Sequence, residues 1–195
     1  MSSKAYLASF IKKLSGSPFL VLDTETTGLG KAEIVQIAII NSEGETLLDE
    51  LVKPVHPIPA RASAIHKITD EKVAAAPLWT EVSRKVVDII TNQSVVIYNR
   101  DFDLNMLYST DKFSDKPILY GWDEIAKDYF CAMKAFAVHN GEWNNYRRSY
   151  AWKPLSQAAK IMKVPVVNAH SALGDCRMTL GVVKAMLKAH SEGIG

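Results

Sequence analysis

The spacing of apolar residues predicts where helices form along the chain. Residues 4–14, 79–90 and 171–190 carry apolar side chains every three or four positions, which places them on one face of a helix. Residues 154–162 begin with a proline, which is favoured at the first position of a helix. Two shorter segments, 101–108 and 130–138, are also predicted to be helical, whereas residues 140–153 lack periodicity and are interpreted as a loop.

Short apolar runs predict the strands. Residues 19–22, 34–40, 46–52 and 94–98 form runs of the length typical of buried strands. The turn-forming sequence Asn-Ser-Glu-Gly at residues 41–44 joins the second and third runs, which predicts a hairpin. Because strands come first and then alternate with helices, we expect an α/β fold with a mixed central sheet.

Composition is typical of an ordinary globular protein of one domain. The 195 residues are 48% hydrophobic and 23% charged, and they contain no repeat or Gly/Ser-rich linker. No segment has the roughly 18 consecutive apolar residues of a membrane span, and the N-terminus lacks the pattern of a signal peptide. The two cysteines, Cys131 and Cys176, are predicted to be buried thiols without a redox role. We expect a cytoplasmic protein that makes no membrane contact.

The net charge of +2, from 23 basic and 21 acidic residues, does not by itself indicate a nucleic-acid-binding protein. The position of the acids is more informative. Asp23 and Glu25 end the first apolar run, and the two-residue repeat of a strand places both on the same face. Asp103 follows the run at 94–98, and Asp175 comes five residues after His170, near the start of the last helix.

Each of these acids has an ordinary explanation when it is considered alone. Asp101 or Asp103 could cap a helix, and Asn168 or Ser171 could cap the last helix while His170 is a surface residue. Taken together, four acids could supply the oxygen ligands that Mg²⁺ prefers, and two such ions can stabilise both oxygens of a phosphodiester that is being cleaved. A neutral histidine beside them is suited to act as a general base.

Several motifs resemble those of a known family. Residues 23–29 read Asp-Thr-Glu-Thr-Thr-Gly-Leu, residues 65–69 read Ile-His-Lys-Ile-Thr, and residues 170–175 fit a His-x-x-x-x-Asp pattern. In this order they resemble the DEDD 3′–5′ exonucleases of the histidine-containing branch, which includes the proofreading epsilon subunit of bacterial DNA polymerase III and exonuclease X. Residues 130–134, Phe-Cys-Ala-Met-Lys, are similar to the exonuclease X type. The resemblance extends from about residue 19 to residue 187.

The resemblance implies a ribonuclease H-like mixed sheet flanked by helices, in a single exonuclease domain over residues 1–195. Residues 1–17 would form an N-terminal helical extension and residues 18–190 the catalytic core. The implied reaction is metal-dependent 3′–5′ hydrolysis of terminal phosphodiester bonds of DNA, with release of nucleoside 5′-monophosphates. Two Mg²⁺ or Mn²⁺ ions would be held by four acids, with a histidine taking the proton of the attacking water: Asp23, Glu25, Asp103, Asp175 and His170.

The resemblance also implies substrate-binding residues. Thr26, Thr27 and Gly28 would contact the 3′-terminal nucleotide, Leu29 would wedge beside the last base, and Asn99 matches the second motif. His66 would lie near the terminal nucleotide, although it could instead be a loop histidine packed against Ile65 and Ile68.

Two positions depart from the family pattern. Tyr98 stands where the second motif usually begins with a histidine, so the packing beneath the site is expected to differ. Residues 131 and 132 read Cys-Ala where many relatives carry Asp-Thr, and nothing in the sequence indicates what this changes.

The segment between residues 139 and 163 combines basic and aromatic side chains. It contains Arg147, Arg148 and three lysines against the single acid Glu142, interleaved with four large aromatic residues. Such a segment could bind phosphates and stack on unpaired bases upstream of the scissile bond, or it could be a solvated loop with its aromatics packed on the protein.

We therefore predict a partner that is a nucleic acid with a free 3′ end, DNA in preference to RNA. The alternatives are an exoribonuclease with the same chemistry and a non-catalytic nucleic-acid-binding module. A proofreading subunit that works with a protein partner, or a homodimer, is a further alternative, in which the N-terminal helix could be a docking surface.

Overall fold

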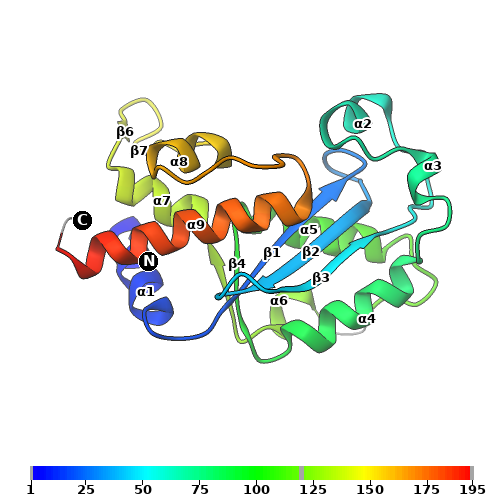
Figure 1. Cartoon of the computed structure of the whole chain (residues 1–195), viewed down its shortest axis with the longest axis horizontal. Coiled ribbons are helices and arrows are strands. Elements are labelled where there is room, and N and C mark those ends of the chain that lie inside the picture. Colours follow the sequence, from blue (N-terminus) through cyan, green and yellow to red (C-terminus); the bar gives the residue numbers. More distant parts are fainter. Residues whose placement is uncertain (1, 119–120, 194–195) are drawn as a thin grey trace.

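A five-stranded mixed sheet forms the centre of the molecule in the computed structural model, which describes residues 2–118 and 121–193 (Figure 1). The strand order is β3-β2-β1-β4-β5. The pairs β3–β2 and β2–β1 are antiparallel, and the pairs β1–β4 and β4–β5 are parallel. The strands are β1 (Leu20–Thr26), β2 (Ile34–Asn41), β3 (Thr46–Leu51), β4 (Ser94–Ile97) and β5 (Asp128–Cys131).

Helices cover both faces of this sheet because both faces carry apolar residues. One face packs against α1 (Ser3–Leu14), α7 (Ala132–Asn140), α8 (Leu155–Ile161) and α9 (Ala172–Ser191). The other packs against α4 (Trp79–Ile90), α5 (Arg100–Asp111) and α6 (Trp122–Ile125). Along β1 the side chains alternate, so that Val21 faces α9 whereas Leu20 and Leu22 face α4 and α5. This alternation decides which side of the sheet each later residue of β1 reaches.

Most of the predicted elements are present, and the differences lie where local patterns were short. Residues 130 and 131 were predicted to be helical but belong to β5, and the helix starts only at Ala132. Pro154 precedes α8 instead of occupying its first position. The predicted loop at 140–153 contains a two-stranded hairpin of β6 (Trp143–Asn144) and β7 (Ser149–Tyr150). Two short helices, α2 (Ala60–His66) and α3 (Asp70–Val73), follow the proline-rich connection and were not predicted. No helix within residues 2–118 and 121–193 is long and apolar enough to cross a membrane.

The N-terminal helix packs into the same core as the sheet. Phe10 is fully buried, and its ring meets Phe130 edge to face with centroids 5.8 Å apart. The Tyr6 hydroxyl group lies within hydrogen-bonding distance of the backbone N–H and C=O of Cys131, at 2.6 and 3.3 Å. These contacts join α1 to the junction of β5 and α7, which favours a structural role for α1 over a docking surface.

Replacing Phe10 by alanine should therefore destabilise the whole protein, by about 3–5 kcal/mol, because a buried aromatic ring is removed and a cavity remains. Urea denaturation gives the free energy of unfolding. Lys12→Ala, at an exposed position of the same helix, serves as the control and should change it little. Equal stability of the two variants would mean that α1 is separable from the core.

Candidate active site

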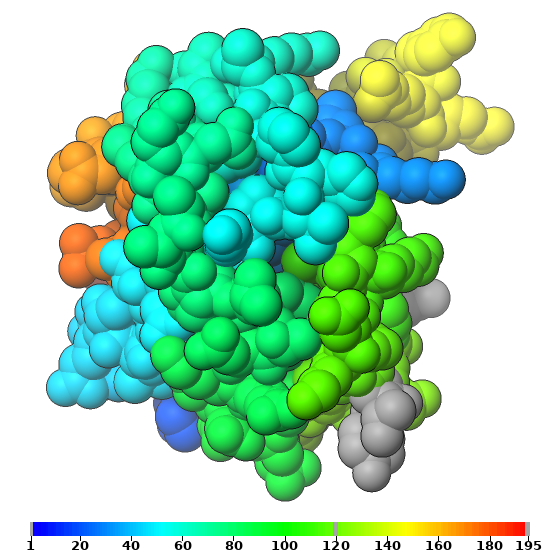
Figure 2. All heavy atoms as spheres, turned by 90° about the vertical axis from the view of Figure 1, so that its right-hand side faces the viewer, coloured from blue at the N-terminus to red at the C-terminus, as the bar shows by residue number. Residues whose placement is uncertain are grey.

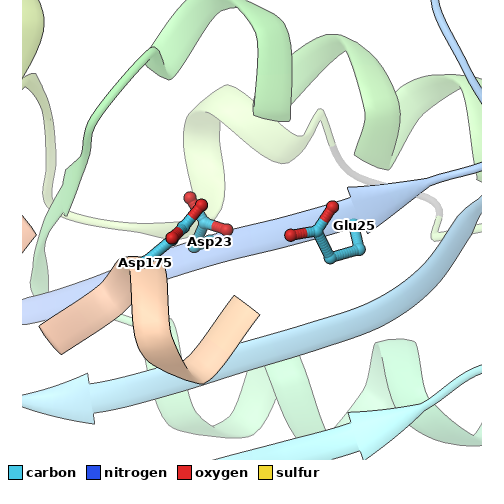
Figure 3. A group of neighbouring side chains, drawn as sticks. All are labelled: Asp23, Glu25 and Asp175. Atoms are coloured by element: carbon cyan, nitrogen blue, oxygen red, sulfur yellow. The ribbon is translucent and has the colours of Figure 1, made fainter. Parts of the chain in front are cut away.

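Three carboxylates converge at the carboxyl end of β1 (Figure 3). Asp23 and Glu25 continue the alternation from Val21 and so face α9, whose first turn carries Asp175. One side-chain oxygen from each of the three residues lies within 4.8 Å of the others. Residues 150 positions apart in the sequence thus form one cluster of oxygen ligands.

Asp103 approaches from the opposite face of the sheet, on α5. Its side chain is buried, and its Oδ1 accepts a hydrogen bond of 2.7 Å from the Thr24 hydroxyl group. Because Thr24 points to the face opposite Asp23, this bond holds Asp103 beside β1 but outside the group of three. Its charge still reaches the cluster, since it contributes to the raised pKa of both Asp23 and Glu25.

Burial and mutual repulsion make the ionised state of this cluster costly. Burial, followed by the charges of its acidic neighbours, raises the pKa of Asp23 well above its usual value and that of Glu25 to about 8. Burial also raises the pKa of Asp103 to about 7, against the lowering effect of the bond from Thr24. The pKa of Asp175 is raised by burial and lowered in part by the backbone N–H of His170. Hard oxygen ligands that repel one another fit a site for divalent cations of the Mg²⁺ or Mn²⁺ type, which would remove this repulsion.

The start of α9 positions Asp175 and His170. Ser171 caps the helix by accepting a hydrogen bond from the N–H of Gly174, and its own hydroxyl group donates to the carbonyl of Asn168. A Cβ at Gly174 would lie 2.1 Å from that carbonyl, so this close approach requires glycine. The segment before the helix therefore folds back over its first turn.

This fold-back brings His170 and Asp175 together through the backbone. The N–H of His170 donates to Oδ1 of Asp175 over 3.3 Å, and His170 has a positive φ of 65°. The His170 ring is exposed and makes no hydrogen bond within the described parts of the chain. It is thus placed beside the acidic cluster and free to meet a substrate or water.

The segment after β1 forms one wall of a pocket of about 330 Å³ next to Glu25. Thr26, Thr27, Gly28 and Leu29 line one side, and residues of α2 line the other. His66 is buried in this wall: its Nδ1 accepts from the N–H of Ile68 over 3.0 Å, and the Thr26 backbone lies close enough to the ring to influence its pKa. Burial lowers the pKa of His66, which favours a neutral ring.

Leu29 stands at the rim of the pocket with 80% of its surface exposed. The wedge role that the resemblance implies for Leu29 stays a prediction. Arg61 of α2 also lines the pocket and was not predicted.

Other supporting residues were not predicted either. The backbone N–H of Glu33 donates to the Thr27 hydroxyl group over 2.9 Å, and the Thr27 N–H donates to the Glu33 carbonyl. The buried Glu33 carboxylate accepts from the N–H groups of Val55 and His56, so it ties the pocket wall to the next connection. Gln36 joins β2 to the first turn of α9, since its Oε1 accepts a hydrogen bond from the N–H of Ala172. Neither Glu33 nor Gln36 lies in one of the motifs found in the sequence.

The remaining predicted site residues are not part of the cluster. Asn99 caps α5 through its carbonyl, while its half-buried side chain makes no capping bond. Arg147 and Arg148 lie on the β6–β7 connection, among neither the clustered acids nor the lining of the 330 Å³ pocket. Both cysteines are buried and free, as predicted.

Comparison with known proteins identifies the family. The exonuclease family RNase_T matches residues 20–183, and the chain belongs to this family. The chain is 42% identical over 194 residues to a protein of Escherichia phage 186 named uncharacterized exonuclease CP81, with 95% of this chain and 96% of the relative covered. It is 27% identical over 169 residues to exodeoxyribonuclease 10 of Escherichia coli K12, with 84% and 66% covered. The protein is therefore an exonuclease, and the resemblance to the DEDD exonucleases is confirmed.

Solved structures show the same fold. The nuclease domain of 3′hExo, described as a DEDDh family member bound to rAMP, superposes with a TM-score of 0.65 at 15% identity, covering 91% of this chain and 93% of that domain. Exonuclease I of E. coli in complex with a dT13 oligonucleotide gives 0.66 at 20% identity, covering 91% of this chain and 42% of that one. This chain thus spans less than half of exonuclease I. The predicted ribonuclease H-like α/β fold is confirmed, and exonucleases of this family use divalent metal ions.

The raised pKa values predict how the metal-free protein responds to pH. These carboxyls titrate near pH 4 when unfolded but higher when folded, to about 8 for Glu25, so the folded state binds more protons in between. Metal-free stability should therefore fall as the pH rises from about 4 to about 8, and Mg²⁺ should restore it at the upper end. Asp23→Asn should remove part of this loss and raise the metal-free Tm at pH 8.5, by about 2–4 °C for each kcal/mol of repulsion relieved.

Thermal melts in EDTA at pH 5 and 8.5, with and without Mg²⁺, measure these effects. Asp88→Asn, at an exposed position of α4, is the matched control and should behave like the wild type. An Asp23→Asn protein that is less stable than the wild type at pH 8.5 in EDTA would contradict the repulsion.

Proposed function

We propose that this exonuclease removes nucleotides from the 3′ end of DNA by hydrolysis assisted by two divalent cations, releasing nucleoside 5′-monophosphates. The observation that carries this proposal is the convergence of Asp23, Glu25 and Asp175, with Asp103 held by Thr24 at the edge of the same site. Crowded acids whose pKa values are raised serve no purpose in a passive binding module, because they destabilise the fold and repel phosphate.

The four acids would hold Mg²⁺ or Mn²⁺, which supply positive charge beside the attacking and leaving oxygens. His170 would accept the proton of the attacking water, since its side chain is exposed and its backbone N–H is bonded to Asp175 of the acidic cluster. Asp175 itself is fixed by the cap at Ser171 and by the N–H of His170, so base and ligand are positioned by one short segment.

The 330 Å³ pocket would hold the 3′-terminal nucleotide against Glu25. The backbone of Thr26, Thr27 and Gly28 would contact its sugar, and Leu29 would lie against the last base pair or base step. His66 lines this pocket opposite Thr26 and Thr27, and this position supports a contact to the substrate. Its packing on Ile68 is a second role of the same residue.

A panel of end-labelled substrates tests the reaction, its polarity and its substrate. We expect divalent-dependent release of mononucleotides from the 3′ end of single-stranded DNA, with a label at the 5′ end retained on ladders of shortening products. An RNA of the same sequence should be digested more slowly. Faster digestion of RNA would establish the exoribonuclease alternative, and 5′ release or no release with Mg²⁺ or Mn²⁺ would reject the proposal.

His170→Gln should lower kcat by about 10²–10⁴-fold, because a glutamine cannot accept the proton, while the metal ligands remain. Binding of the oligonucleotide in Ca²⁺, measured by anisotropy, should change little. His190→Gln is a matched control, since this histidine lies in the last turn of α9, at the opposite end of the helix from Asp175. Loss of binding together with kcat would assign His170 to substrate binding instead of proton transfer.

A further inference from the structure

The segment between α7 and α8 is an ordered hairpin that projects from the molecule. β6 pairs antiparallel with β7, and the Ala151 N–H extends the pairing by donating to the Glu142 carbonyl over 2.8 Å. At the tip, the N–H of Arg147 donates to Oδ1 of Asn144 over 2.9 Å. In Figure 2 this hairpin (yellow) and the segment after β1 (blue) project toward the same edge of the molecule, and Figure 1 shows that they lie at opposite ends of its long axis. We call residues 141–153 the hairpin finger.

Two of its four aromatic residues brace the finger, and two remain available. Trp143 and Tyr150 are cross-strand partners whose rings meet edge to face with centroids 5.2 Å apart. Tyr146 is 95% exposed at the tip, and Trp152 is 57% exposed after β7. Trp143 is itself 51% exposed, so one short hairpin presents three large aromatic side chains to solvent, which marks it as a candidate binding surface.

Trp152 lies between two hollows. One, of about 220 Å³, is lined by the finger itself, including Arg147 and Tyr150. The other, of about 290 Å³, is lined by Tyr150 and Trp152 together with Tyr6 and Lys134 from α1 and α7. An exposed aromatic ring that lines open space can stack on the bases of a single strand.

The charge of the finger suits a phosphate backbone. Arg147 and Arg148 are exposed and form no ion pair with the described residues, whereas Lys153 is bound by Glu142 over 2.7 Å. The ion pair between Lys153 and Glu142 therefore lies at the base of the finger, and the two exposed arginines give its tip a net positive charge. This complementarity favours a nucleic acid over an apolar protein surface.

One hydrogen bond connects the finger to the active site. The Tyr98 hydroxyl group donates to the Lys153 carbonyl over 2.7 Å, and Tyr98 follows directly after β4. β4 is the parallel neighbour of β1, with Val96 level with Val21. The carboxyl ends of these two strands therefore lie side by side. The pocket and the acids are at the end of β1, Tyr98 is at the end of β4, and the finger is bonded to Tyr98. A strand whose 3′ end occupies the pocket could cross the acids and reach the finger.

We propose that the hairpin finger binds the unpaired DNA strand upstream of the scissile bond. Trp152 and Tyr146 stack on bases, Arg147 and Arg148 contact phosphates, and Tyr98 is a positioning residue that holds the finger in line with the site. This inference depends on the proposed function and adds to it a preference for single-stranded 3′ ends long enough to reach the finger.

The test is the dependence of kcat/KM on substrate length, from a dT trimer to a dT 15-mer. The wild type should prefer the 15-mer, and the double variant Tyr146→Ala/Trp152→Ala should lower the ratio of 15-mer to trimer by about tenfold or more, since one stacked base contributes about 1–3 kcal/mol. Tyr146→Phe/Trp152→Phe keeps both rings and should restore most of the ratio. Tyr98→Phe removes only the bond to Lys153 and should lower the ratio to a smaller extent.

Arg147→Ala/Arg148→Ala should also lower the ratio, and it should flatten the salt dependence of 15-mer binding in Ca²⁺ by a slope of about 1.4 for two phosphate contacts on a single strand. Arg84→Ala/Lys127→Ala removes two cations near α4 and α6, away from the finger in Figure 1, and should leave ratio and slope unchanged.

These measurements distinguish a failure of the finger proposal from a failure of the proposed exonuclease reaction. An unchanged ratio in the aromatic and arginine variants would overturn the inference and leave the exonuclease activity in place, with a protein partner as the remaining occupant of the finger. A parallel loss on trimer and 15-mer would also overturn it. A wild type that digests neither substrate would overturn the proposed function as well.

Discussion

Repulsion among the carboxylates at the end of β1 is the constraint to which the surrounding structure responds. Asp23 and Glu25 lie on one face because of strand geometry, and Asp175 is brought against them by α9. Without cations, burial makes their ionisation costly, as the pKa of Glu25 at about 8 indicates. The fold can hold such a group only if other contacts prevent the acids from moving apart.

Those contacts come from polar residues around the acids. Thr24 holds Asp103, Gln36 holds the first turn of α9 through Ala172, and Glu33 ties Thr27 to the connection after β3. Each of these bonds pairs a motif residue with a partner that the motifs do not predict. They hold the acids in position before any cation binds. The entropy lost in ordering the ligands is therefore lost during folding and not during cation binding.

How far the sequence predicts this site follows from the range of the interactions. Asp23 and Glu25 could be placed on one face because a strand alternates every two residues, and the long helix at Ala172–Ser191 is periodic enough to be found. β5 was missed because its four residues run directly into α7, and a short apolar run cannot be assigned by periodicity. The bond between Thr24 and Asp103 spans 79 positions, and no local pattern contains it.

Tyr98 illustrates how a departure from a family pattern can be explained by a distant segment. As a sequence feature it indicates only that the packing beneath the second motif differs. In the structure its hydroxyl group donates to the Lys153 carbonyl, at the base of a hairpin for which the sequence predicts only a loop. The side chain that replaces the usual histidine therefore connects the catalytic strands to a basic, aromatic finger. The net charge of +2 does not reveal this arrangement, because the negative charges of the clustered acids and the positive charges of the exposed arginines cancel when all charges are added. With cations bound, both parts would attract the same phosphate backbone.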